Sequence, residues 1–322
     1  MRILMLTRFY LNGQTTHVIT LCSQLRRFGH QPYLVMTNFH HPAYHQWLKH
    51  EQIPFSTQAN PQFLNQLKHK YDFDLIHTHS AHTLELALNL GNQWQVPVVA
   101  TCHYLDFQPL DVLAQADKII TISEEMQRSL PLPEEKTVMI ENGVPIESSY
   151  RHKRRELRQA LIVTRMTAQK EPGYGQLVHI LLTHGWQVSS IGNWRPYKYG
   201  IPYSGWRVDL SSAYRAADLV IGTGRSVREG MAAGAAAMVL GDYLDGLVTE
   251  DNVTTLRYAN FSGRATKRLP TYQALSEQVQ KLADPAVLQR LQHFSYEYAR
   301  QHFDIKKVTS QIIDVYQACL VS

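Results

Sequence analysis

The chain has 322 residues, a length typical of about two domains. Apolar residues make up 44% and charged residues 18%, which excludes a disordered chain. The net charge of +5 suits an anionic substrate or an acidic membrane surface, but it is too small to indicate nucleic acid as a partner.

The cysteines and the hydropathy predict the compartment. Cys22, Cys102 and Cys319 are far apart, which is typical of free thiols in a reducing compartment. The opening MRILMLT is too short an apolar run for a signal peptide, and no later run has the length of a transmembrane helix. We therefore expect a soluble cytoplasmic protein, and peripheral contact with the inner face of the membrane stays open.

Strands and helices are expected to alternate over the first 150 residues. A strand at 2–7, a turn at 11–13, a helix at 15–28 and a strand at 33–37 make a βαβ unit. Residues 38–70 are less regular, with helices expected near 45–51 and 61–69. Further strands are expected at 74–78, 97–101, 118–122 and 137–140, separated by helices at 81–90, after residue 101 and from Ser123. This alternation predicts a parallel sheet covered on both faces.

The pattern restarts after an interruption at residues 147–159, where the basic run 151–155 indicates a domain boundary. A strand is expected at 160–164, a helix at 175–183 and a strand at 187–191. An aromatic loop follows at 193–206, with a short strand near 206–208. From residue 270 onward the chain is expected to be helical. The sequence thus predicts an α/β protein with two Rossmann-like domains that face a central cleft and end in a long C-terminal helix.

Residues 216–241 predict an anion site in the second half. A strand at 218–221 is followed by Gly222 and Gly224, which permit a tight turn. Ser226 is expected to open a helix that Gly234 closes, before a strand at 235–240. A helix N-terminus at the carboxyl end of a parallel strand presents unpaired N–H groups to an anion.

A series of motifs stands in an order typical of one protein family. The motifs are Asn12-Gly13 with His17-Val18, Phe28-Gly29-His30, DLIHTH at 74–79, Thr101-Cys102-His103, Ala116-Asp117 with Ser123-Glu124, Asn142-Gly143-Val144, Thr164-Arg165 with Lys170, and EGMAAG at 229–234. With these motifs the sequence resembles glycosyltransferases of the two-domain GT-B fold, and most of all the retaining family 4 (glycosyltransferase group 1). The resemblance covers nearly the whole chain.

The resemblance implies a retaining hexosyltransferase (EC 2.4 type) that moves a sugar from a nucleotide-diphosphate sugar to an unidentified acceptor hydroxyl. A UDP-sugar is the expected donor, and a saccharide, lipid or protein the expected acceptor. The implied domains are residues 1–150 for the acceptor, 151–300 for the donor and a helix at 301–322 that packs back toward the first domain. The resemblance implies no cofactor and no essential metal.

The resemblance also implies the site residues. His103, Arg165 and Lys170 would be catalytic, the two cations by stabilising the negative charge of the diphosphate leaving group. The implied donor-binding residues are Gly13, His79, Asn142, Gly224, Arg225, Ser226 and Glu229. Gly13 would let the backbone approach a phosphate, and Glu229 would accept hydrogen bonds from the ribose hydroxyls.

Two departures and two local alternatives stand beside these roles. Asn12 replaces the first of two glycines that the family commonly has, and Ile221 replaces a glutamate that often lies eight residues before the one matched by Glu229. The residues from Ser226 to Glu229 also fit a capping box, in which Glu229 would serve only its own helix. Arg225 could be a solvated side chain.

Other functions remain open at this point. His77 and His79, with His82 nearby, could hold a metal, and so could Asp72 and Asp74. The protein could also be a sugar-nucleotide epimerase or hydrolase of the same fold. A further hypothesis is a nucleotide-sugar binding protein that has lost catalysis. A membrane surface could be met by residues 44–49, 151–155 and 194–199.

Overall fold

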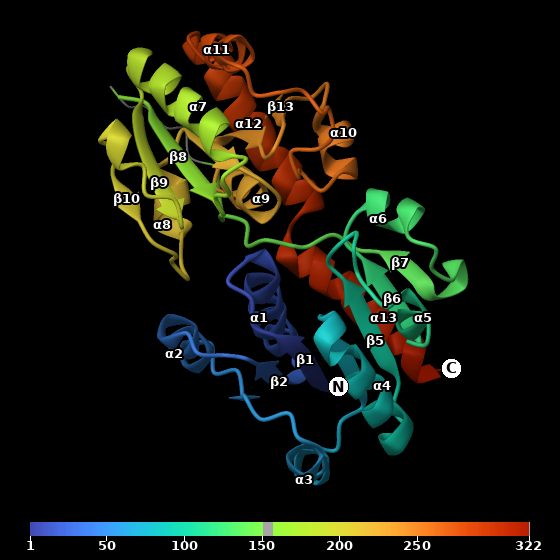
Figure 1. Cartoon of the computed structure of the whole chain (residues 1–322). Coiled ribbons are helices and arrows are strands. Elements are labelled where there is room, and N and C mark those ends of the chain that lie inside the picture. The colour runs from blue at the N-terminus through green and yellow to red at the C-terminus, as the bar shows by residue number, and fades with distance from the viewer. Residues whose placement is uncertain (151–156, 322) are drawn as a thin grey trace. The chain divides into compact units, whose positions relative to one another are not determined.

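The structure is a computed structural model that describes residues 1–150 and 157–321 and divides the chain into two compact units (Figure 1). Unit 1 comprises Met1–Gly143 together with the chain from Ile305 onward, and unit 2 comprises Val144–Asp304. The C-terminal segment therefore belongs to the unit in which the chain begins. The basic run at 151–155 lies outside the described residues.

Within its described residues, unit 1 contains a seven-stranded parallel sheet of order β3-β2-β1-β4-β5-β6-β7. The strands are β1 (Arg2–Arg8), β2 (Gln31–Thr37), β3 (Phe55–Ser56), β4 (Leu75–Thr78), β5 (Val98–Cys102), β6 (Lys118–Thr121) and β7 (Thr137–Met139). Residues 3–7, all of β4 and all of β5 are buried. Such near-continuous burial is typical of strands covered on both faces of a sheet.

The helices of unit 1 are α1 (Gly13–Arg27), α2 (Pro42–His50), α3 (Pro61–Tyr71), α4 (Ala81–Trp94), α5 (Leu110–Leu113), α6 (Glu124–Ser129) and α13 (Ile305–Val321), with a short 3-10 turn, η1 (Glu134–Lys136). The N-cap of α1 is Asn12, whose side chain accepts a hydrogen bond from the Gln14 N–H. Helix α13 packs against α1. The first residue of α13, Ile305, passes close to Gly143. A side chain at that position would collide with it, because a Cβ there would lie 2.8 Å from the Cα of Ile305.

Within its described residues, unit 2 contains a six-stranded sheet of order β10-β9-β8-β11-β12-β13. The strands are β8 (Gln159–Thr164), β9 (Gln187–Gly192), β10 (Tyr203–Ser204), β11 (Leu219–Gly222), β12 (Ala236–Leu240) and β13 (Leu244–Leu247). Strand β13 pairs antiparallel with β12, and the other described pairs are parallel.

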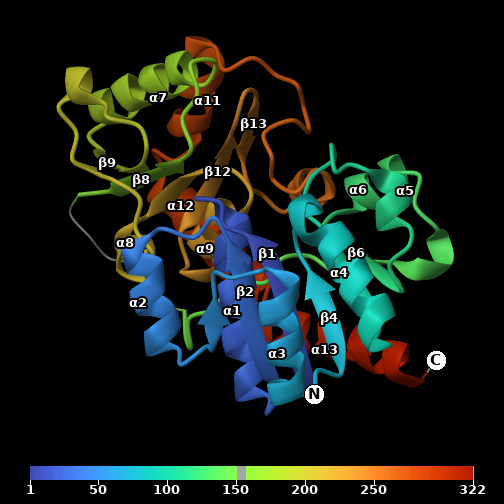
Figure 2. The ribbon, with the colours of Figure 1, turned by 60° about the horizontal axis from the view of Figure 1, so that its bottom comes forward.

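The helices of unit 2 are α7 (Glu171–Thr183), α8 (Ser211–Ala216), α9 (Arg225–Ala232), α10 (Val253–Tyr258), α11 (Tyr272–Lys281) and α12 (Pro285–His302), with the 3-10 turn η2 (Tyr197–Tyr199). Helices α7 and α11 lie side by side (Figure 2). Leu177 of α7 and Leu275 of α11 pack with Ile162 and Ile221 in one core cluster. Val227 and Met231 of α9 pack with Val239 in a second core cluster.

Some predicted elements differ from the structure. The edge strand is β10, which pairs with Ser190 and Ile191 of β9, so the strand expected near 206–208 is wrong. Helix α7 begins at Glu171, ahead of the predicted 175, because Pro172 suits the first turn of a helix and does not break it there. The short elements β3, β13 and α10 are absent from the prediction, since two to six residues carry little periodicity.

The structure also shows the state of the three cysteines and the length of the helices. Cys22 and Cys102 are buried free cysteines and Cys319 is a partly exposed one. Burial raises the pKa of Cys102 to about 12 and that of Cys319 to about 11. None of the helices within residues 1–150 and 157–321 combines the length and the apolar character needed to cross a bilayer.

Candidate functional site

The candidate residues of unit 1 follow the carboxyl ends of its strands. His79 directly follows β4 and His103 directly follows β5, while Gly13 opens α1 after β1. Asn142 follows β7, and its buried Oδ1 has no hydrogen-bond partner within the described residues. Because parallel strands end at the same edge of a sheet, these positions share the edge at which α/β proteins bind ligands.

A cluster of buried histidines lies at this edge. It consists of His17 from α1, His77 from β4, and His79 and His103, each at most 7% exposed. The ring centroids of His77 and His79 are 4.0 Å apart, and the centroid of His17 is 5.9 Å from that of His79 and 5.6 Å from that of His103. His79 Nδ1 lies 3.2 Å from His103 Nε2. Since His79 and His103 are 24 residues apart in sequence, the pairing of β4 with β5 brings them together.

Burial keeps His77, His79 and His103 neutral. Desolvation lowers the pKa of His103 to about 3, and it lowers the pKa of His77 to about 3 with a further contribution from His103. The pKa of His79 is also well below its ordinary value, first through burial and then through the neighbouring histidines. At neutral pH these rings are therefore uncharged, and their chemistry is that of hydrogen-bond donors and acceptors.

Gln14 joins the start of α1 to the end of β4. Its buried side chain donates from Nε2 to the backbone oxygen of His79 (2.6 Å) and lies 3.4 Å from the Thr7 hydroxyl. Gln14 was not among the site residues predicted from the sequence. Its position directly after the expected phosphate turn at Gly13 is the signal that could have marked it.

In unit 2 the turn after β11 is built on glycine. A Cβ at Gly222 would lie 2.5 Å from the Ser226 Oγ and 2.5 Å from the Val163 backbone oxygen. Gly224 is the N-cap of α9 with φ 57°, a conformation that favours glycine. Helix α9 begins at Arg225, one residue before the predicted start at Ser226.

We expect the Gly222→Ala variant to destabilise unit 2 by about 1–3 kcal/mol, because overpacking displaces Ser226 or the Val163 backbone. Differential scanning calorimetry measures the shift in Tm. Gly205→Ala is the matched control, since a Cβ there would meet only the Tyr203 hydroxyl at 3.6 Å. Equal melting of the two variants would contradict the steric requirement.

The capping-box reading of Glu229 is wrong. Ser226 lies inside the first turn of α9, and its hydroxyl donates to the Thr223 backbone oxygen (2.9 Å), so Ser226 is not the N-cap. Glu229 Oε1 instead accepts a hydrogen bond from Arg225 Nε at 2.7 Å, and the two side chains are 18% and 10% exposed. Arg225 is therefore a paired, mostly buried cation, and the solvated reading is wrong as well.

The carboxylate of Glu229 influences a buried tyrosine. Burial, and next the charge of Glu229, raise the pKa of Tyr214 well above its ordinary value. Tyr214 belongs to α8, the helix that precedes β11. The Glu229 carboxylate is thus held by a cation on its own helix, which preorganises it at the carboxyl edge of the sheet, and its charge acts on a buried phenol of another helix.

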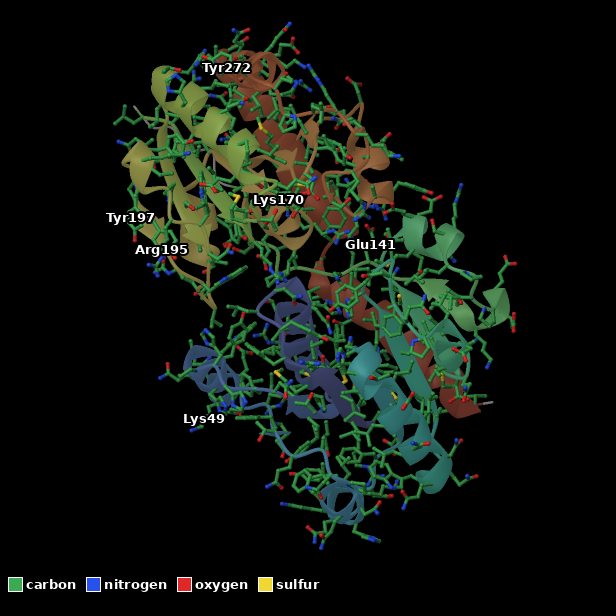
Figure 3. All side chains as sticks on the ribbon, viewed as in Figure 1. Lys49, Glu141, Lys170, Arg195, Tyr197 and Tyr272 are labelled. Atoms are coloured by element: carbon green, nitrogen blue, oxygen red, sulfur yellow. The ribbon has the colours of Figure 1, made fainter. Side chains whose placement is uncertain are left out.

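Arg165 and Lys170 flank the loop after β8. Arg165 directly follows the strand and is exposed, while Lys170 is the half-buried N-cap residue of α7 (Figure 3). The Asn193 side chain holds this loop in place, because its amide accepts from the Met166 N–H (2.7 Å) and donates to the Met166 oxygen (3.1 Å). Asn193 follows β9 and is a further residue that the sequence analysis did not single out.

Ile221 differs in kind from the glutamate expected at its position. It lies within β11, is fully buried and packs in the apolar cluster with Ile162 and Met238. A side chain in that place cannot contact a ligand. If a glutamate at this position binds the ligand in relatives, other residues of this chain must make that contact.

The structure does not support the two hypothetical metal sites. Within residues 1–150 and 157–321, no group of three or more His, Cys, Asp or Glu side chains could hold a metal ion. Asp72 and Asp74 lie at the amino edge of the sheet, where Arg2 binds them at 3.2 and 3.3 Å. His82 is exposed, and its Nδ1 lies 3.1 Å from the Tyr10 hydroxyl. These side chains therefore have structural partners of their own.

The candidate membrane segments are only partly at the surface. Trp194 and Tyr44 are 4% exposed, so their rings belong to the cores. Arg195, Tyr197 and Lys198 are exposed, and Figure 3 shows Arg195 and Tyr197 at the rim of unit 2.

Residues 11–148 match the family model of Glycosyltransferase Family 4. Among solved structures, the chain is similar to HepE of Anabaena in complex with UDP-glucose, with a TM-score of 0.74 and 17% identity over 99% of this chain and 100% of that one. The chain has a GT-B fold, and residues 11–148 are similar to the glycosyltransferases of family 4.

Other proteins of this fold are similar to the chain over its whole length. Sucrose-phosphate synthase from Thermosynechococcus elongatus gives a TM-score of 0.71 at 18% identity over 99% of this chain and 100% of that one. A UDP-GlcNAc 2-epimerase from Neisseria meningitidis, bound to UDP-GlcNAc, gives 0.65 at 11% identity over 99% and 100%. No curated protein matches the sequence. Transferases and epimerases thus share this fold, and the chemistry must be argued from the residues of the site.

Proposed function

We propose that this GT-B protein is a retaining hexosyltransferase that uses a UDP-sugar and needs no metal ion. The Arg225–Glu229 pair on the first turns of α9 carries the proposal. A carboxylate that does not cap its own helix, and is nevertheless held in place by a cation, is available to a ligand. The solved complexes of HepE with UDP and with UDP-glucose support a uridine nucleotide as the donor.

Glu229 is assigned to the ribose. Arg225 binds Oε1 of the carboxylate, and Oε2 is the oxygen that we assign to the ribose hydroxyls. A carboxylate accepts strong hydrogen bonds from hydroxyl donors, and the fixed geometry of the ion pair limits the entropy lost on binding.

The diphosphate is assigned to the glycine turn and its cations. The turn from Gly222 to Gly224 leads into α9, whose first N–H groups and positive dipole end favour an anion. Arg165 and Lys170 supply positive charge at the same edge of the sheet. As the bond from the sugar to the phosphate oxygen breaks, these charges stabilise the leaving group more strongly than the bound donor.

The reaction we propose proceeds with retention, and the departing phosphate takes the proton of the acceptor hydroxyl. The neutral His103 would bind an oxygen of the donor, together with Gly13 and Asn142 from the same edge of unit 1. Full turnover in EDTA and a product of unchanged anomeric configuration are the expected results. An inverted product would contradict the proposal. The acceptor is a saccharide, lipid or protein hydroxyl, and the site of action is the cytoplasm or the inner membrane face.

The Glu229→Gln variant tests the proposed function. Glutamine keeps the shape but lacks the charge, so UDP-glucose and UDP should bind roughly ten- to a hundredfold more weakly, as expected for hydrogen bonds to a charged group. Isothermal titration calorimetry measures both affinities. Glu297→Gln is the matched control, because it removes another Arg–Glu pair within one helix of unit 2, that of Glu297 with Arg300. Wild-type affinity in Glu229→Gln would remove the ribose assignment.

An epimerase is the second candidate, because the chain is structurally similar to UDP-GlcNAc 2-epimerases. Incubation with UDP-GlcNAc in the absence of an acceptor separates the two functions. An epimeric nucleotide sugar in the proton NMR spectrum would establish the epimerase, and release of UDP into water a hydrolase. Binding of the nucleotide sugar without turnover on any acceptor would indicate a binding protein, the outcome that Ile221 keeps open.

A further inference from the structure

The hydrogen bond between His79 and His103 joins two neutral imidazoles. Nδ1 of His79 and Nε2 of His103 are 3.2 Å apart, and both side chains are buried. A neutral imidazole carries one N–H and one bare nitrogen, so a hydrogen bond between two such rings requires one proton between the facing atoms. The tautomer of either ring therefore determines the tautomer of the other.

Two arrangements satisfy this requirement. If His79 donates from Nδ1, then His103 has a bare Nε2 and carries its proton on Nδ1. If His103 donates from Nε2, then His79 carries its proton on Nε2 and His103 Nδ1 is bare. The two outer nitrogens, Nε2 of His79 and Nδ1 of His103, are buried without a hydrogen-bond partner within the described residues.

The exposure of the two rings distinguishes the arrangements. A buried N–H without an acceptor is rarer and less favourable than a buried acceptor without a donor. His79 is 0% exposed, whereas His103 reaches the surface with 7% of its area, so a ligand or water can meet the buried outer nitrogen of His103 with less rearrangement than that of His79. The arrangement that leaves a bare nitrogen on His79 and places the N–H on His103 is therefore the one whose outer N–H can gain an acceptor.

We propose that His79 is a positioning residue that holds His103 as the neutral Nδ1–H tautomer, and that this N–H donates to an oxygen of the donor substrate. That oxygen belongs to the diphosphate or to a sugar hydroxyl. The tautomer of His103 depends on residues of unit 1 alone, whereas the ligand contact rests on the proposed function. His103 then binds the donor as an uncharged hydrogen-bond donor, and it does not act as a base through Nε2.

The surroundings keep His79 in the orientation that the proposal needs. Its backbone oxygen accepts from Gln14 Nε2 at 2.6 Å. Its ring packs on His77, whose own nitrogens lie 2.6 Å from the Tyr316 hydroxyl and 2.7 Å from the Thr101 hydroxyl. Tyr316 belongs to α13, so the C-terminal helix contacts the histidine cluster through this hydroxyl.

Two-bond proton–nitrogen correlation spectra of the full chain, labelled with nitrogen-15 at histidine, test the proposal at neutral pH. Each histidine tautomer gives a distinct pattern, and the resonances missing in His103→Gln and in His79→Leu assign the two rings. The expected result is an Nδ1–H tautomer for both rings. His79→Leu should shift His103 toward the Nε2–H form. Tyr316→Phe is the matched control and should leave His103 unchanged, because it removes a hydrogen bond to His77 alone.

An Nε2–H tautomer for His103 in the wild type, or no change of its tautomer in His79→Leu, would overturn the proposal. The wild-type spectrum alone shows the tautomer of His103, even if His79→Leu fails to fold. His79→Asn is the second variant, since its amide can take the place of Nδ1 and should restore the wild-type pattern at His103.

The ligand contact is read separately by titration with UDP-glucose. His79→Leu should bind it about tenfold more weakly than the wild type, and His79→Asn should recover most of the affinity. An altered tautomer with unchanged affinity would exclude the contact between His103 and the donor. If wild-type protein binds no UDP-sugar at all, the proposed function fails, whereas the tautomer in the unliganded protein still decides the role of His79.

Discussion

Replacing Lys170 by methionine is expected to lower the kcat for release of UDP from UDP-glucose by about a hundredfold to a thousandfold, the usual effect of removing one group that stabilises developing charge. Lys170 is half-buried at the start of α7, so its side chain is only partly surrounded by water. Its attraction to the departing phosphate should therefore be stronger than that of an exposed lysine. The affinity for UDP-glucose, measured by calorimetry, should fall much less than kcat, because the negative charge grows only as the bond breaks.

Lys198→Met is the control for this experiment. Lys198 is an exposed lysine of unit 2 in η2, and its ammonium lies 5.1 Å from the centre of the Tyr199 ring. The variant should keep wild-type turnover. Arg165→Met should behave like Lys170→Met, with a smaller loss because Arg165 is exposed. If Lys170→Met weakened binding and turnover equally, Lys170 would bind the ground state and the transition state alike.

Acidification from pH 7 to pH 5 is expected to destabilise unit 1 by about 2 kcal/mol for each of His77 and His103. Their folded-state pKa values are about 3, below the ordinary value of 6.5 for an unfolded histidine. Between these two values the unfolded chain binds more protons than the folded chain. The stability is therefore complete above pH 6.5 and falls as the pH is lowered toward 3. His79, whose pKa is also lowered, acts in the same direction.

Calorimetric unfolding at a series of pH values measures this loss. His77→Gln removes one of the titrating rings and should make the fall of Tm between pH 7 and pH 5 visibly shallower. The exposed His40 offers a control, and His40→Gln should leave the slope as in the wild type. The same slope in His77→Gln and wild type would show that the buried histidines do not govern the acid response.

The sequence by itself determined the fold class and most of the elements near the site. Apolar runs flanked by glycine and polar residues predict buried strands, and β4, β5, β8 and β11 lie within a residue or two of the predicted positions. The glycine turn of residues 222–224 was also predictable, because few other residues permit such a backbone. These features depend on residues that are adjacent in the chain, so they can be predicted from the sequence.

Only the tertiary structure decided which partner each site residue has. The sequence allowed Glu229 to cap its helix, and the structure shows it bound to Arg225, because the backbone at Gly224 places the helix start before Ser226. The hydrogen bond between His79 and His103 and the one between His77 and Tyr316 join residues that are 24 and 239 positions apart in the sequence. Such contacts follow from strand order, register and the return of α13 to unit 1, and periodicity along the chain does not encode them.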